Sequence, residues 1–81
     1  MKVRVLLFAS FREAVGASEQ TVEVKSGATV GDVWSRVAAE HPRLAPHAGT
    51  AAFGINGTYA RPGERVAEGD EVAFLPPVSG G

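Results

Sequence analysis

Apolar and polar residues alternate along three parts of the chain, which is the pattern of half-buried β-strands. These parts are residues 2–8, 21–24 and 72–75. Two shorter alternating runs flank Asn56-Gly57, a dipeptide that favours the type I′ turn of a β-hairpin. The pattern therefore predicts five strands, and the first two are expected to form an antiparallel hairpin.

Apolar residues at helical spacing predict one main helix in the middle of the chain. Thr29 is expected to cap its start, with Asp32 near the positive end of the helix dipole. Pro42 disfavours helical geometry at His41 and so ends the helix there. Asp32 is also expected to pair with Arg36 one turn later on the exposed side. The apolar face comprises Val30, Val33, Trp34 and Val37.

Turn residues separate these elements. A short helical turn is expected between Ser10 as its N-cap and Gly16 as its stop, and Pro46 and Gly49 predict a loop after the main helix. The order is two strands, one main helix and three short strands. It predicts an α+β domain of the β-grasp type, ubiquitin-like, with a mixed sheet of about five strands and the helix on one face.

Composition narrows the classes of function. The chain of 81 residues is long enough for one domain, and it contains no apolar run that could span a bilayer. A net charge of −1 without a basic cluster argues against nucleic-acid binding. His41 and His47 have no third ligand nearby, so no metal site is predicted. The first residues alternate between charged and apolar side chains and do not resemble a signal peptide. The protein is therefore predicted to be cytoplasmic.

Residues 76–81 are expected to form a flexible diglycine tail beyond a domain of residues 1–75. The tail has no ionisable side chain, spans about 20 Å when extended, and ends in two glycines that can pass through a narrow channel. The chain has no cysteine, so it could carry reactive sulfur only on the carboxylate of Gly81, after activation of that group by ATP. A frayed chain end is the competing interpretation.

The stretch from Glu68 to Gly81, with its proline pair and diglycine end, resembles the C-terminus of molybdopterin synthase small subunits. Phe8-Ala9, Arg12-Glu13, Gly16 and Ile55-Asn56-Gly57-Thr58 continue the resemblance. It implies that an ATP-dependent activating enzyme adenylates Gly81 and that a sulfur donor protein converts it to a thiocarboxylate. The large synthase subunit would then use this sulfur on a pterin precursor during molybdenum cofactor synthesis. The chain itself would bind no cofactor and would be a non-catalytic subunit.

The same resemblance implies a partner-binding region around the start of the tail, with Ser79 and Gly80 leading to the reactive end. Carriers for thiamine or tungsten cofactor synthesis, a protein modifier that joins Gly81 to lysines, and a passive binding module stay open as alternatives. The residues assigned to partner binding are Phe74, Leu75, Pro76, Pro77 and Val78.

Overall fold

A computed structural model describes residues 1–77 of the chain. Val78, Ser79, Gly80 and Gly81 of the predicted tail lie outside the described residues. The elements are β1 (Lys2–Leu7), α1 (Ala9–Val15), β2 (Glu19–Glu23), α2 (Val30–Glu40), a 3₁₀ helix η1 (Pro42–His47), β3 (Ala52–Ile55), β4 (Thr58–Ala60) and β5 (Glu71–Leu75).

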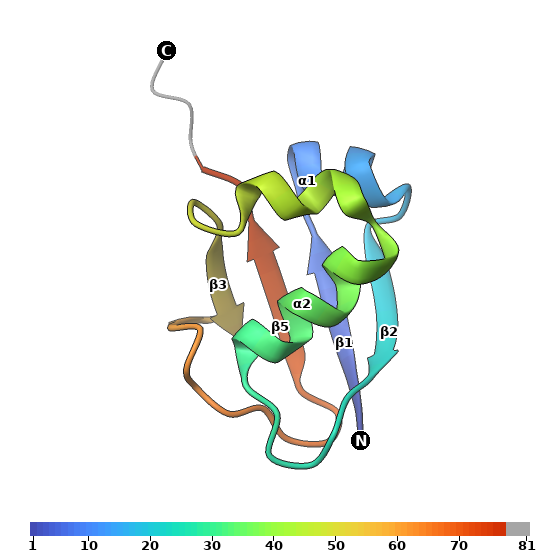
Figure 1. Cartoon of the computed structure of the whole chain (residues 1–81). Coiled ribbons are helices and arrows are strands. Elements are labelled where there is room, and N and C mark those ends of the chain that lie inside the picture. Colours follow the sequence, from blue (N-terminus) through green and yellow to red (C-terminus); the bar gives the residue numbers. More distant parts are fainter. Residues whose placement is uncertain (78–81) are drawn as a thin grey trace.

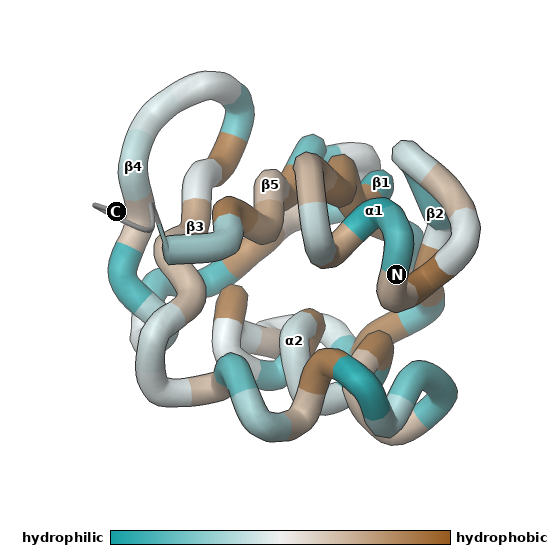
Figure 2. Tube along the Cα trace, turned by 90° about the horizontal axis from the view of Figure 1, so that it is seen from above, coloured by the Kyte–Doolittle hydropathy of each residue, from teal (hydrophilic) through white to brown (hydrophobic). Residues whose placement is uncertain are grey.

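The strands form one mixed sheet in the order β2-β1-β5-β3-β4. β1 and β5 are parallel neighbours at its centre, and every other adjacent pair is antiparallel. α2 lies across one face of this sheet (Figure 1), so that the molecule has two layers when seen from above (Figure 2). The predicted α+β class, the five strands and the pairing of the first two strands are confirmed.

The core lies between the sheet and α2. Alternate residues of the central strands, such as Val5 and Phe74, point toward the helix and have no exposed surface. The four residues of the predicted apolar face of α2 are all buried, and they pack against these strand residues. Trp34 is packed edge-on against Phe74 and Phe53, with ring centroids 5.0 and 5.7 Å away. This burial of apolar surface is the main source of stability in so small a domain.

A reciprocal pair of hydrogen bonds begins α2. The backbone N–H of Asp32 donates to Thr29 Oγ1 (3.1 Å), and the backbone N–H of Thr29 donates to Asp32 Oδ2 (2.9 Å). The predicted cap is therefore confirmed. The predicted pair of Asp32 with Arg36 is wrong, because Arg36 pairs with Glu40 instead. The Arg36 guanidinium donates to Glu40, attracts its negative charge and so lowers the pKa of that carboxyl.

Two local predictions need correction. α1 begins at Ala9 after an extended Phe8, so Ser10 lies inside the helix and is not its cap; Gly16 ends the helix in the left-handed conformation as predicted, with φ of 87°. The stretch expected as a loop forms the helix η1, in which Leu44 is fully buried. Proline is tolerated in such a short element because few of its N–H groups need an intrahelical acceptor.

The N-terminal cap of α2 yields a stability prediction. Replacing Thr29 with Ala removes the acceptor for the Asp32 N–H and is expected to lower the free energy of unfolding by about 1 kcal/mol. Urea denaturation followed by Trp34 fluorescence measures this loss. Thr29→Ser keeps the hydroxyl and should stay close to wild type. Equal stability of the Ala and Ser variants would show that the cap contributes nothing.

Candidate functional site

The end of β5 fixes where the tail begins. β5 pairs with β1 on one side and with β3 on the other, up to the Ala52–Leu75 pair. Pro76 follows at once and has no N–H to extend the ladder. Pro76 is half-buried and Pro77 is exposed. The chain therefore leaves the sheet at the end opposite its N-terminus (Figure 1).

Phe74 and Leu75 lie on opposite faces of β5, as adjacent strand residues must. Phe74 has no exposed surface and its ring packs against Trp34 and Phe53. Its assignment to partner binding is thus corrected to a core role, since a partner cannot touch it in this structure. Leu75 is half-buried on the sheet face that α2 leaves bare. It stays a candidate for partner contact together with Pro76 and Pro77.

An apolar hollow lies beside Leu75 on the bare face of the sheet. It has a volume of about 270 Å³, and its rim includes Phe8 and Tyr59. Phe8 is 43% exposed and Tyr59 is 82% exposed, which makes them the large hydrophobic residues that are exposed in residues 1–77. Exposed aromatic side chains around a depression are typical of sites that bind another protein.

Small residues form the floor of the apolar hollow. Gly54 pairs with Ala73 on β5 and with Tyr59 on β4, so neither floor residue fills the space between the strands. A Cβ atom placed on Gly54 would lie 3.3 Å from the carbonyl oxygen of Thr58 and 3.7 Å from the Cβ of Ala73. The missing side chain therefore keeps both the hairpin and the hollow in shape.

The rest of the bare face is charged. Arg4 projects from β1 between Glu19 of β2 and Glu71 of β5, and its guanidinium pairs with both carboxylates. The Nε atom of Arg4 lies 3.1 Å from Glu19 Oε1. Such exposed pairs contribute little stability, but they make this half of the face strongly hydrated. A partner that binds through apolar contacts is therefore expected on the other half of this face, beside Leu75 and the tail.

Sequence reasoning did not assign Phe8 or Tyr59 to partner binding. The available signal was alternation: each is an apolar residue at a position where the strand pattern calls for a polar one. Tyr59 follows the predicted Asn56-Gly57 turn, whose two residues have φ of 49° and 86° and so confirm the tight hairpin. Only the three-dimensional sheet brings Phe8, Tyr59 and Leu75 together, because they come from three separate strands or strand ends.

Two further features of the described residues concern a metal site and a membrane span. Residues 1–77 contain no group of three or more His, Asp or Glu side chains arranged to hold a metal ion. Within the same residues, none of the helices has the length and apolar character needed to cross a bilayer. The candidate functional site in the described part of the chain is the apolar hollow beside Leu75, at the base of the tail.

The fold and this surface define a ubiquitin-like β-grasp domain. A family model described as the ThiS family matches residues 5–81, so the chain belongs to the ThiS family. The molybdopterin synthase sulfur carrier subunit of Chlamydomonas reinhardtii is 43% identical to it, and the match covers 100% of both chains.

Two further proteins are similar in structure. Small archaeal modifier protein 1 of Haloferax volcanii is 38% identical over 93% of this chain and 95% of its own. The crystal structure of SAMP1 from that organism matches the whole of both chains with a TM-score of 0.90 and 35% identity. A chain from the protein–protein complex of subunits 1 and 2 of molybdopterin-converting factor from Helicobacter pylori covers 100% of both chains, with a TM-score of 0.68. Its identity is 21%, so it supports the fold alone.

The different roles of Phe74 and Tyr59 can be separated by stability measurements. Phe74→Ala leaves a cavity beside Trp34 and is expected to lower the free energy of unfolding by about 3–5 kcal/mol. Tyr59→Ser changes a side chain that is already in water, so the expected change is within about 0.5 kcal/mol. Urea titrations of the two variants beside wild type measure both values. Similar losses in the two variants would contradict the division into core and surface.

Proposed function

We propose that the chain is the sulfur carrier subunit of molybdopterin synthase and that the Gly81 carboxylate is its working group. The full-length similarity to a sulfur carrier subunit carries this proposal, because the alignment includes the diglycine end. The chain acts as a sulfur-donating subunit in the cytoplasm, and a separate large subunit performs the chemistry on the pterin precursor. The apolar hollow supports this division, since it offers a surface on which a large subunit can dock.

Activation is needed because a terminal carboxylate, with a pKa of about 3.3–3.7, is an anion at neutral pH and resists nucleophiles. An adenylating enzyme transfers AMP from ATP to Gly81 and releases pyrophosphate. The outer sulfur of a persulfide on a donor protein then attacks the acyl carbon, and AMP leaves with the electron pair of the broken C–O bond. A second thiol attacks the resulting acyl disulfide, which releases the thiocarboxylate and leaves a disulfide on the donor side. The chain contributes its terminal carbonyl, while its partners supply the ATP and the sulfur.

Docking and delivery fit together in space. The apolar hollow and the start of the tail lie at the same end of the bare sheet face, with Leu75 belonging to both. A partner that covers Phe8 and Tyr59 is thus placed beside the emerging tail. The six tail residues span about 20 Å when extended, which is enough to reach a buried active site in that partner.

A second candidate function is protein modification. The similarity to small archaeal modifier protein 1 over nearly the whole chain favours it. The same acyl adenylate is required, and the amine of a lysine replaces sulfur as the nucleophile. The two functions therefore share Gly81 and differ in the group that attacks it.

The sulfur carrier proposal predicts a defined mass change. Incubation with the adenylating enzyme, ATP and a sulfur donor is expected to add about 16 Da, from exchange of one oxygen for sulfur. Intact-mass spectrometry measures the change, and a variant lacking Gly81 is the control that should not gain sulfur. No gain in the full chain, under conditions in which the enzyme releases pyrophosphate with it, would refute the carrier proposal.

The docking surface can be tested separately with the large subunit. Tyr59→Ser and Leu75→Ser each remove apolar contact area and are expected to weaken binding about tenfold, which corresponds to about 1.4 kcal/mol. Calorimetric titration of the large subunit measures the affinity. Arg43→Ser, an exposed change on η1 away from the hollow, is the control. Unchanged affinity in both hollow variants would place the docking surface elsewhere.

A further inference from the structure

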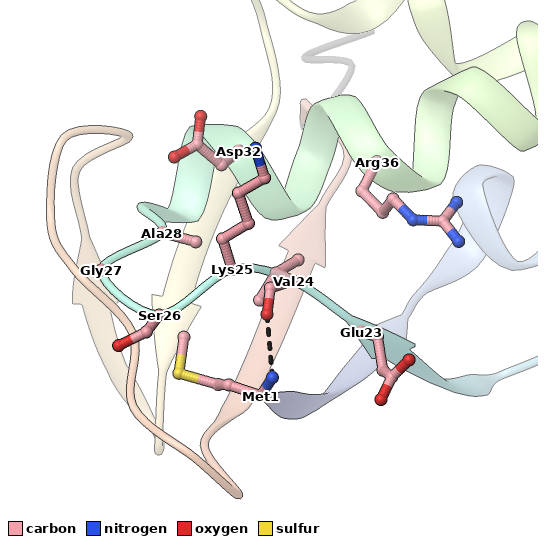
Figure 3. Close-up of a pocket in the computed structure, with 9 residues that line it drawn as sticks. All are labelled: Met1, Glu23, Val24, Lys25, Ser26, Gly27, Ala28, Asp32 and Arg36. Carbon is pink, nitrogen blue, oxygen red and sulfur yellow. Dashed lines mark hydrogen bonds between the residues drawn. The ribbon is translucent and has the colours of Figure 1, made fainter.

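A second depression, which we call the N-terminal groove, lies between the end of β2 and the first turns of α2. Its volume is about 690 Å³, within the range of ligand-binding pockets. Apolar and charged side chains both line it (Figure 3). The apolar ones are Met1, Val24 and Ala28, and the charged ones are Glu23, Lys25, Asp32 and Arg36. The groove lies at the end of the molecule opposite the point where the tail leaves β5 (Figure 1).

The amines near the N-terminal groove differ in their availability. The terminal ammonium of Met1 donates to the carbonyl oxygen of Val24 at 2.9 Å. Lys25 is exposed, and its side chain extends toward Asp32 at the start of α2 (Figure 3). The chain contains one other lysine, Lys2, which projects from β1 with the outward-facing residues of the bare face and does not line the groove. Lys25 is thus the lysine that the groove presents.

We propose that the N-terminal groove is an acceptor site for the activated tail of a second copy of this chain, and that Lys25 is the residue modified. This inference rests on the proposed adenylation of Gly81. It identifies a lysine on the carrier itself that the activated carboxyl can reach. The product is two copies joined head to tail by an isopeptide bond.

The chemistry of the tail suits the groove. Its proline and valine residues match the apolar surface of Met1 and Val24, and its glycines allow close approach to the backbone. Adenylated Gly81 carries a negative phosphate, which the basic side chain of Arg36 attracts, while Glu23 and Asp32 are the acidic residues of the lining. The apolar character of the occupant is therefore complementary to the site, and Arg36 offers a basic group to its phosphate.

The geometry favours a tail from another copy. β1 runs parallel to β5, and its six residues place the groove about 20 Å along the strands from the end of β5. The groove also lies two strand spacings to the side, which adds a lateral distance of about 10 Å. A tail of about 20 Å would have to stretch flat across the sheet of its own chain. The tail of a second copy reaches the groove without this constraint.

The bond change is an acyl transfer. The Nζ atom of Lys25, in its neutral form, attacks the carbonyl carbon of adenylated Gly81, and a C–N bond forms. The bond from this carbon to the phosphate oxygen breaks, and AMP leaves with the electron pair. The proton lost from nitrogen passes to water. ATP is the only co-reactant, and no oxidation or reduction occurs.

The test uses the full chain with the adenylating enzyme and ATP, without a sulfur donor. Wild type is expected to form a species with twice the monomer mass less one water, and peptide sequencing by mass spectrometry should locate the Gly81–Lys25 junction. Lys25→Arg keeps the charge at the groove and is expected to reduce this product at least tenfold. Lys2→Arg is the matched control and should form as much of it as wild type.

Pyrophosphate release, measured in the same reactions, separates this inference from the function on which it rests. Release with no joined product, a junction at Lys2 or Met1, or a monomer that has lost water would overturn the acceptor site and leave the proposed activation intact. Absence of release from wild type would overturn the proposed activation, and the acceptor site would fall with it.

Discussion

The parallel pairing of β1 with β5 is the constraint on which the rest of the molecule depends. These two strands join the beginning and the end of the domain at the centre of the sheet. Each has partners on both sides, so each alternates between the core face and the bare face without slippage. The direction of β5 then sends the tail away from the N-terminus, and the same pairing aligns Leu7 with Phe74 beneath α2.

α2 covers one face of the sheet, so the other face is exposed and can bind a partner. The core needs bulky inward residues such as Phe74, whereas the outward positions tolerate the small residues Gly54 and Ala73. Their small size produces the apolar hollow, and the ends of neighbouring strands bring Phe8 and Tyr59 to its rim. The core and the candidate docking surface thus lie on opposite faces of the sheet. Residues of the docking surface can therefore be substituted with little loss of stability.

The spacing of apolar residues predicted most of this fold, because strands and helices that are buried on one side repeat apolar residues at a fixed spacing. The alternation of the strands and the apolar face of α2 are confirmed, and so is the capping residue Thr29. The errors arose where tertiary context decides between local options. Asp32 was expected to pair with Arg36, but its carboxylate serves the helix cap. The apolar hollow could not be read from the sequence, since it requires residues from β3, β4, β5 and the end of β1 to meet across a sheet whose strand order is not sequential.

The two ends of the molecule make different demands on an activated tail. A reactive thiol, whose pKa its surroundings lower to about 3.5–7.5, is largely or partly ionised near neutral pH, whereas an ordinary lysine amine, with a pKa of about 10.4, is almost wholly protonated. Sulfur transfer therefore needs only that a donor reach the acyl adenylate. Amide formation needs an amine held beside the carbonyl, and Lys25 is the lysine that lines the N-terminal groove. In the proposed function, one activated carboxyl serves both outcomes, because a sulfur donor reacts wherever it meets the acyl adenylate and an amine reacts only where a surface positions it.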